Sequence, residues 1–352
     1  MLGVEDSAER YLVEATEQDR FSGVVLLARG SDVLLSGAHN QACRRFGVPN
    51  QRDTRFDIAS VGKMFTAVAI GQLVEAGLLS FDAPLATYLP DYPPAVAERV
   101  TIHHLLTHTS GLGSIFDGGW EIASQARSRT IDNLLPHFQD RPLLFEPGDR
   151  WEYSNAGYVL LGAVIESLTG RPYFDYIQQH VFSPARMWDS GAYSLDAEVP
   201  KLAYAYSRLG PTDRVDAEPR WNNVYRHWTT TTPAGCFYST ALDLLRFSLA
   251  LRGGELLSTL MVAALTERTV QTGRRPGERY ARGFFTEDLN GVRVFGHGGT
   301  IPGFQAWLDI YPSLDYTVII LTNFDAPAAR NVVWLVREGL TGASPPPPLT
   351  SA

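Results

Sequence analysis

The stretch Ser60-Val61-Gly62-Lys63 stands where apolar residues begin to recur at helical spacing, so Ser60 is expected at the N-terminus of a buried helix that ends near Gly77. Side chains three residues apart lie on the same helix face, about one turn from each other. Lys63 is one of only two lysines in a chain whose other fixed positive charges are arginines. An amine can lose its proton, whereas a guanidinium cannot. A neutral Lys63 could therefore accept the proton of Ser60 and make that hydroxyl a nucleophile.

Composition limits the classes of function. The 352 residues are 45% apolar, which is enough for one large or two interlocked globular units. The net charge of -8 is spread without basic runs, which argues against nucleic acid and membrane as partners. The acidic start lacks the basic and apolar regions of an export signal, and no stretch reaches transmembrane length. We therefore expect a cytoplasmic protein unless an export signal precedes this sequence. No oligomeric state is indicated.

Local patterns predict helices at both ends of the chain and strands near both ends. A helix is expected over 5–18, followed by paired strands over 22–28 and 33–37. Short helical segments separated by proline-rich turns extend from about 79 to 234, and another helix follows Gly235 through Leu251. Four more strands are expected over 283–288, 292–296, 305–311 and 316–323, then a helix over 328–340 and a proline-rich tail.

A second candidate motif is Tyr153-Ser154-Asn155, which follows a Pro-Gly turn and precedes an apolar helical run. A tyrosine beside an ammonium group and near a helix N-terminus can lose its phenolic proton near neutral pH, because these neighbours stabilise the anion. Tyr153 would then be a base or a proton shuttle. Asn155 could hydrogen-bond both Lys63 and a substrate amide. The structural alternative is a turn tyrosine that is half-buried against a helix.

A third candidate motif is Phe295-Gly296-His297-Gly298-Gly299-Thr300, between the end of an expected strand and a Pro-Gly turn. Its glycines would let a ligand approach the backbone closely. A backbone N–H near Thr300 and the N–H of Ser60 could together bind an oxyanion. His297 would add a donor or a titratable charge. The structural alternative is a flexible hairpin.

Ser-x-x-Lys, Tyr-x-Asn and His-x-Gly, in this order, resemble the three motifs of the serine β-lactamase and penicillin-binding-protein superfamily. The chain is most similar to the class C β-lactamase-like branch, with its D,D-carboxypeptidases, D-amino-acid peptidases, family VIII carboxylesterases and a few acyltransferases. In the third motif the matching residues are His297, Gly298 and Gly299. Two further stretches, 105–112 and Pro233-Ala234-Gly235, also resemble family hallmarks. We interpret both as largely structural, with His108 as a packed turn histidine.

This resemblance implies an α/β fold with a discontinuous domain. Residues 1–78 and 235–341 would form an antiparallel sheet flanked by the terminal helices, and residues 79–234 would form an inserted, mainly helical domain. The active-site cleft would lie between the two. Residues 342–352 are rich in proline and poor in apolar side chains, so we expect a disordered tail there.

The resemblance also implies a mechanism. Ser60 would attack a carbonyl carbon, Lys63 and Tyr153 would move its proton to the leaving group, and the N–H groups of Ser60 and Thr300 would hold the oxyanion. No metal or other cofactor is expected, because His103, His104 and His108 lack acidic ligands at matching spacing. Cys43 and Cys236 are too far apart in the sequence for a metal motif, and Cys236 is typical of a small buried residue.

The substrate expectation rests on one departure from the family and on one aromatic segment. His297 stands where many relatives place a lysine that grips a substrate carboxylate, so it would be a weaker, pH-dependent anchor, and efficient penicillin hydrolysis is not expected. The aromatic segment with Trp221, Tyr225 and Trp228 could line a pocket for a bulky group, or it could pack between domains. We therefore expect a hydrolase of a small-molecule ester or amide. The alternatives are a biosynthetic transacylase, a D,D-carboxypeptidase or β-lactamase, and an inactive binding module.

Overall fold

An eight-stranded antiparallel sheet forms the centre of the protein, as seen in a computed structural model that describes residues 3–115, 129–208, 220–222 and 230–345. The strand order is β2-β1-β12-β11-β10-β9-β8-β7. The strands are β1 (Gly23–Arg29), β2 (Asp32–His39), β7 (Val270–Gln271), β8 (Arg279–Tyr280), β9 (Phe285–Leu289), β10 (Val292–Ile301), β11 (Phe304–Tyr311) and β12 (Tyr316–Thr322). Because β1 pairs with β12, the two ends of the chain build one sheet.

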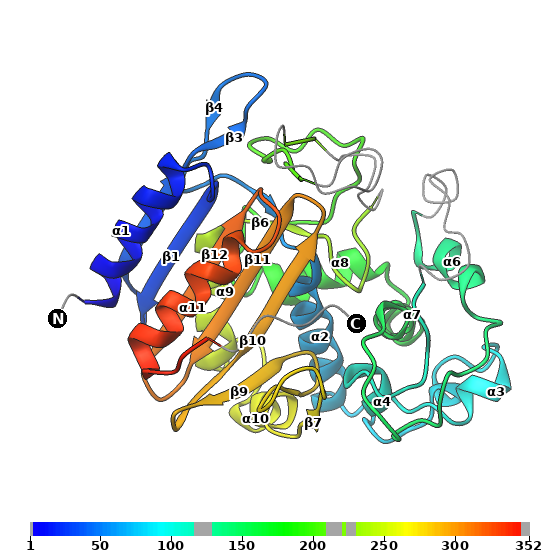
Figure 1. Ribbon diagram of the computed structural model, residues 1–352. Coiled ribbons are helices and arrows are strands. Elements are labelled where there is room, and N and C mark those ends of the chain that lie inside the picture. The colour runs from blue at the N-terminus through cyan, green and yellow to red at the C-terminus, as the bar shows by residue number, and fades with distance from the viewer. Residues whose placement is uncertain (1–2, 116–128, 209–219, 223–229, 346–352) are drawn as a thin grey trace.

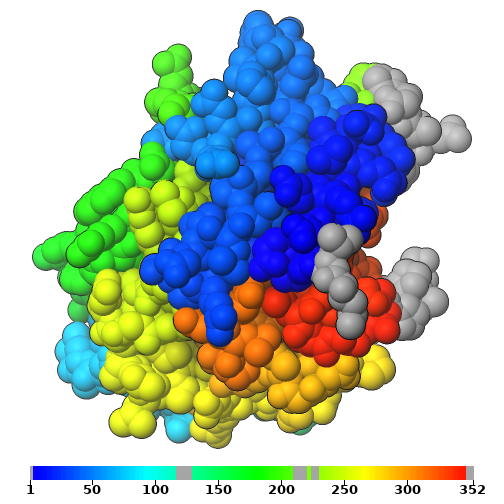
Figure 2. All heavy atoms as spheres, turned by 90° about the vertical axis from the view of Figure 1, so that its left-hand side faces the viewer, coloured from blue at the N-terminus to red at the C-terminus, as the bar shows by residue number. Residues whose placement is uncertain are grey.

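Helices cover both faces of this sheet. The terminal helices α1 (Val4–Glu17) and α11 (Ala328–Thr341) cross one face, while α9 (Ala241–Gly253) packs on the other (Figure 1). The surface view shows the blue N-terminal helix directly beside the red C-terminal one (Figure 2). An antiparallel sheet flanked by the first and last helices confirms the expected fold class.

Coverage of both faces explains why the central strands are apolar at consecutive positions. Val25 and Leu27 of β1 face the cluster formed by the terminal helices. Their neighbours Val24 and Leu26 face a larger cluster that includes α2 (Lys63–Glu75). Successive strand residues point to opposite faces, so a strand with two covered faces has no polar side.

The chain between α2 and β6 (Tyr238–Ser239) is helical wherever the structure describes a regular element. These elements are η2 (Leu85–Thr87), α3 (Pro94–Ala97), α4 (Ile102–Leu106), α6 (Ile131–Leu134), η3 (Leu135–His137), α7 (Asn155–Thr169), α8 (Tyr173–Ile177) and η4 (Gln178–Phe182). Their buried side chains share one apolar cluster with α2 and the sheet. The domain boundaries near residues 79 and 234 therefore stay a prediction, because packing is continuous across them.

The remaining elements are small. They are α10 (Thr259–Thr266), a hairpin of β3 (Gln41–Cys43) and β4 (Val48–Pro49), and a two-residue pairing of β5 (Phe56–Asp57) with β6. Within the described ranges, no helix combines the length and hydrophobicity needed to cross a membrane.

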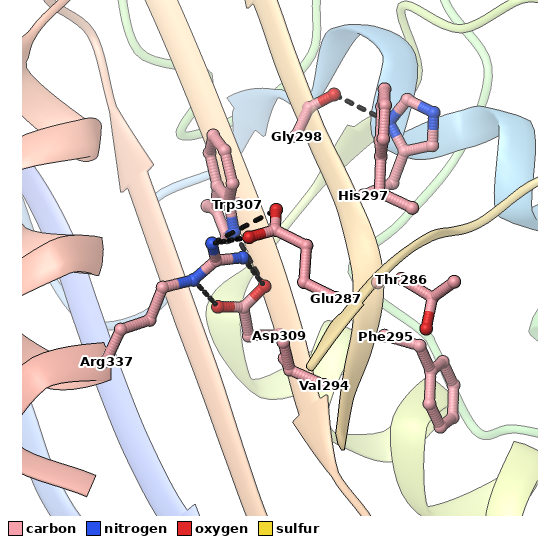
Figure 3. A pocket seen from close by; sticks show the side chains of 11 residues that line it. Thr286, Glu287, Val294, Phe295, His297, Gly298, Trp307, Asp309 and Arg337 are labelled. Carbon is pink, nitrogen blue, oxygen red and sulfur yellow. Dashed lines mark hydrogen bonds and ion pairs between the residues drawn. The ribbon is translucent and has the colours of Figure 1, made fainter. Parts of the chain in front are cut away.

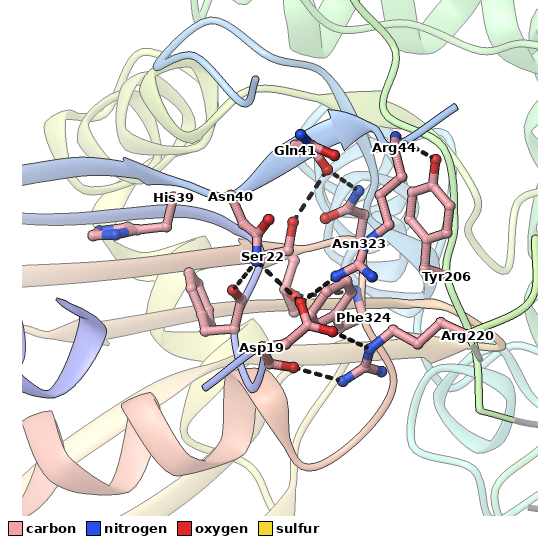
Figure 4. Close-up of polar contacts among 12 residues, drawn as sticks. Asp19, Ser22, His39, Asn40, Gln41, Arg44, Tyr206, Arg220, Asn323 and Phe324 are labelled. Carbon is pink, nitrogen blue, oxygen red and sulfur yellow. Dashed lines mark hydrogen bonds and ion pairs between the residues drawn. The ribbon is translucent and has the colours of Figure 1, made fainter. Parts of the chain in front are cut away.

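Side-chain contacts join the end of β12 to distant loops. Asn323 donates from Nδ2 to the carbonyl oxygen of Gln41 at 3.0 Å (Figure 4). The same nitrogen donates to the carbonyl oxygen of Tyr204 at 2.9 Å. Asp19, after α1, pairs with both Arg44 and Arg220. These bonds tie the chain near residues 41–44, 204 and 220 to the end of β12 and to the segment after α1.

Two sequence expectations need correction. Ser60 lies in a short 3-10 helix, η1 (Ala59–Gly62), and the α-helix begins only at Lys63. The strand expected over 292–296 is longer, since β10 continues through the third motif to Ile301 and pairs with β11 there, which excludes the alternative of a flexible hairpin. Most of the expected tail lies outside the described residues.

Candidate active site

The turn that carries Ser60 has a left-handed backbone just before the serine. Ala59 has φ +46°, which is uncommon for a residue with a Cβ. Its N–H donates to Oδ1 of the buried Asp57 at 2.7 Å, and Tyr193 donates its hydroxyl to Oδ2 of the same carboxylate at 2.7 Å. A 3-10 helix has three residues per turn, so side chains at i and i+3 eclipse. This geometry brings Ser60 and Lys63 together more directly than an α-helix would.

Lys63 is fully buried and makes three short contacts. Its Nζ lies 3.2 Å from Oγ of Ser60, 2.7 Å from Oδ1 of Asn155 and 2.6 Å from the carbonyl oxygen of Ala234. Burial lowers the pKa of Lys63 to about 7. No carboxylate pairs with it among the described residues. Asn155 and Ala234 can accept both hydrogens of a neutral amine, which leaves the nitrogen lone pair for the hydroxyl of Ser60.

Tyr153 stands before α7 and lies beside the same nitrogen. The Nζ of Lys63 is 4.8 Å from the centre of the Tyr153 ring, and the phenol interacts with the side chain of Ser60. Burial raises the pKa of Tyr153 well above its usual range, an effect larger than the lowering by Ser60 and Arg274. The expected loss of its proton near neutral pH is therefore wrong, because desolvation of a phenolate outweighs its favourable neighbours. Tyr153 keeps its proton in the free protein.

Two glycines allow three chain segments to meet at Ser60. A Cβ on Gly235, where φ is +140°, would lie 2.2 Å from the carbonyl oxygen of Ala59. A Cβ on Gly299 would lie 2.3 Å from the carbonyl oxygen of Ile58 and 3.0 Å from the nitrogen of Ser60. Only glycine fits at both positions. The third motif is thus held against the Ser60 turn, and Thr300 follows at the mouth of the site.

His297 is buried and uses both ring nitrogens within the protein. Its Nδ1 donates to the carbonyl oxygen of Gly298 at 2.6 Å (Figure 3). Its Nε2 lies 3.1 Å from the hydroxyl of Tyr280. Burial, with a smaller effect of Lys63, lowers the pKa of His297 to about 3. The imidazole is therefore neutral at physiological pH, which corrects the expectation of a pH-dependent anchor for a carboxylate.

Two cavities adjoin Ser60, and Thr300 lines both. The smaller one, of about 90 Å³, includes Asn155, Ala234 and Gly235. The larger one, of about 340 Å³, includes Tyr153, His297 and Gly298 together with Arg274 and Arg275. The two arginines belong to a turn between β7 and β8, and both pair with the buried Glu278.

These arginines were not foreseen from the sequence. The available signal was the run Gly273-Arg274-Arg275-Pro276-Gly277, a turn rich in charge, but nothing local places that turn beside Ser60. Arg274 is partly exposed, with its guanidinium carbon 5.7 Å from the ring centre of Trp151 and 5.4 Å from that of Phe285. It gives the larger cavity a positive charge that His297 does not supply.

The expected aromatic rim is only partly described. Tyr225 and Trp228 lie outside the described residues. Trp221 lines neither cavity at Ser60, and instead its backbone exchanges two hydrogen bonds with Ser207. Its proposed substrate contact therefore has no support from the geometry.

The other titratable clusters have structural contacts. His103 accepts a hydrogen bond from Nε of Arg282 at 3.1 Å, and His104 completes a capping box with Thr101. Within the described part of the chain, no group of three or more His, Cys, Asp or Glu side chains could hold a metal ion. Cys43 and Cys236 are free and buried.

Comparison with known proteins identifies the family. The family model described as Beta-lactamase matches residues 8–342. The chain belongs to the β-lactamase family. Members similar to it include esterase EstB of Burkholderia gladioli, 32% identical over 88% of this chain and 88% of its own length. A penicillin-binding protein of Bacillus subtilis (strain 168) is 30% identical over 87% of this chain and 69% of its own length.

A solved structure agrees with this assignment. The crystal structure of a penicillin-binding protein from Bacillus halodurans superposes with a TM-score of 0.82 at 34% identity, covering 92% of this chain and 97% of that one. The protein is thus a β-lactamase-like serine hydrolase with the fold of that family.

Proposed function

We propose that this β-lactamase family member hydrolyses an ester or amide of a small molecule through an acyl intermediate on Ser60. The observation that carries the proposal is the distance of 3.2 Å between Nζ of Lys63 and Oγ of Ser60, with the pKa of Lys63 lowered to about 7 by burial. At neutral pH a large fraction of this lysine is an uncharged amine within reach of the serine proton.

In the proposed acylation, Oγ of Ser60 bonds to the carbonyl carbon while its proton moves to Nζ of Lys63. The N–H groups of Ser60 and Thr300 stabilise the oxyanion. The leaving group departs with a proton from the hydroxyl of Tyr153, which is replenished from Lys63. Water then attacks the acyl group by the reverse proton path, which restores the free serine.

The two cavities suggest where the leaving group and the acyl group of a substrate bind. The leaving group must lie near its proton donor, Tyr153, which lines the larger cavity with Arg274. The acyl group then occupies the smaller cavity beside Asn155. We infer a preference for a short acyl chain joined to a larger leaving group, favoured further where that group is anionic.

A direct test is intact-mass spectrometry of the protein after brief exposure to p-nitrophenyl esters, a β-lactam and D-amino-acid amides, followed by peptide mapping. We expect the acyl mass on the peptide that contains Ser60, and no adduct or turnover in Ser60→Ala. Turnover by Ser60→Ala would overturn the proposal. Adding an alcohol and analysing the products separates hydrolysis from acyl transfer.

A further inference from the structure

His108 lies outside the three motifs, yet it contacts the second motif on both sides of Tyr153. The carbonyl oxygen of His108 accepts the N–H of Glu152 at 2.9 Å. Its Nδ1 accepts the N–H of Ser154 at 3.1 Å. The two bonds bracket Tyr153, and the imidazole centre lies 4.3 Å from the centre of the Tyr153 ring. One residue thus holds the backbone before the phenol, the backbone after it, and one face of the ring.

His108 has a backbone conformation that is uncommon for a residue with a side chain. It is 1% exposed, and its φ of +59° is in the left-handed region. Because Nδ1 accepts a hydrogen bond, the ring hydrogen is on Nε2, which has no hydrogen-bond partner among the described residues. A strained backbone and an unpaired buried donor both lower the stability of the fold, so stability alone does not explain a histidine at this position.

An acid–base role does not explain the site. The pKa of His108 is well below its usual value, mainly through burial and further through Lys63 and His297. The imidazole is neutral at physiological pH, and its one accepting nitrogen is already used by Ser154. His108 therefore offers its neighbours a fixed, uncharged ring and a hydrogen-bond acceptor at Nδ1.

We propose that His108 is a positioning residue for Tyr153, and that it sets the phenol where it can give a proton to the leaving group. The inference rests on the proposed function, in which Tyr153 is that donor. Loss of His108 should then act on proton delivery and leave the nucleophile Ser60 and its base Lys63 in place.

Leaving-group dependence tests this role. The measurement is kcat/KM, which reports acylation, for two esters with the same acyl group. A p-nitrophenyl ester releases a stable anion that needs no proton, whereas an ethyl ester releases an alkoxide that does. Loss of the phenol by Tyr153→Phe should lower kcat/KM for the ethyl ester about 100-fold more than for the p-nitrophenyl ester.

The informative variants are His108→Asn and His108→Gly. Both residues tolerate a left-handed backbone, so the bond from Glu152 is kept, but only asparagine offers an acceptor near the position of Nδ1. We expect His108→Gly to show the same selective loss of kcat/KM for the ethyl ester that is expected of Tyr153→Phe. In His108→Asn, kcat/KM for that ester should be about tenfold higher than in His108→Gly. The control is His104→Asn, because Nδ1 of His104 also accepts a backbone N–H, from Thr101 at 3.2 Å, without contacting Tyr153.

Each outcome decides the matter. Equal losses for both esters, unchanged kinetics in His108→Gly, or an asparagine variant no better than glycine would overturn the inference. If wild-type protein cleaves neither ester, the proposed function fails instead. Should His108→Gly not fold, His108→Asn decides alone. A larger loss of kcat/KM for the ethyl ester than for the p-nitrophenyl ester supports the role, and equal losses for the two esters contradict it.

Discussion

The Nζ of Lys63 lies 2.6 Å from the carbonyl oxygen of Ala234, which joins the start of α2 to the segment before β6. One residue earlier, the carbonyl oxygen of Pro233 accepts the hydroxyl of Thr66 at 2.7 Å. These bonds fix the direction of the lysine nitrogen, so its lone pair can face Ser60 when the amine is neutral. Pro233-Ala234-Gly235, interpreted from sequence as structural, thus contacts the proposed base directly.

Replacing this amine by a guanidinium should stop the reaction. In Lys63→Arg the positive charge is kept but the basicity is lost, so we expect kcat/KM for a p-nitrophenyl ester to fall by about 1000-fold. The matched control is Lys201→Arg, because Lys201 is the only other lysine and forms an exposed ion pair with Asp53. Activity within a few-fold of wild type in Lys63→Arg would refute the role of the amine.

The pH profile of kcat/KM should show that one group must lose its proton before the protein is active. Because the proposed base is the neutral form of Lys63, kcat/KM should rise with pH through about 7 and then level off. Tyr153, whose pKa burial raises, adds no fall below strongly alkaline pH, and His297 titrates near 3. A rate that declines between pH 6 and 8 would contradict this assignment.

The buried carboxylate of Asp57 should make stability depend on pH. Burial raises its pKa from 3.8 to about 6, so its contribution to stability is full below pH 4 and is lost as the pH rises through 6. The loss is about 3 kcal/mol by pH 8. Asparagine at this position has no proton to lose. The free energy of unfolding of Asp57→Asn minus that of wild type should therefore increase by up to about 3 kcal/mol between pH 4 and pH 8. Denaturant unfolding at the two pH values measures it, and an unchanged difference would refute the buried charge.

A methyl group at Gly299 should push the third motif away from Ser60. The added Cβ of Gly299→Ala would meet backbone atoms of Ile58 and Ser60, which cannot move aside as a flexible side chain would. We expect a loss of about 1–3 kcal/mol in stability and a fall of about 100-fold in kcat/KM. Gly253→Ala, near the end of α9, is the control because its Cβ meets nothing closer than 3.8 Å. Full activity of Gly299→Ala would show that this contact does not position the site.

Arg274 should favour substrates with an anionic leaving group. In Arg274→Gln we expect KM for a carboxylated ester to rise about tenfold while KM for its neutral counterpart is unchanged. Arg279→Gln is the control, since Arg279 is exposed on β8 and bonds Thr269. Equal effects on KM for both esters would show that the substrate carboxylate does not bind at Arg274. Slow turnover of nitrocefin also stays a prediction. It can be measured in wild-type protein and in Arg274→Gln.

Much of the fold could be predicted because its signals are local. The apolar spacing of 5–18 and 328–340 predicted the terminal helices within two residues, and the local strand patterns predicted β1, β2 and β9 to β12. The short strands β3 to β8 were missed, because two or three residues carry too little pattern to be recognised. The end of β10 was also placed too early, since glycines in a strand look like a turn.

What the sequence by itself determined was the set of reactive groups: a serine and a lysine three residues apart, a Tyr-x-Asn, and a His-x-Gly. Spacing along the chain is enough for these, because one turn of helix sets the distance between neighbours. Only the tertiary structure decided their charges. Desolvation depends on every segment packed around a group, so burial made Lys63 a weak base near neutral pH, kept the proton on Tyr153 and removed the charge of His297, while folding brought Arg274 to the same cavity.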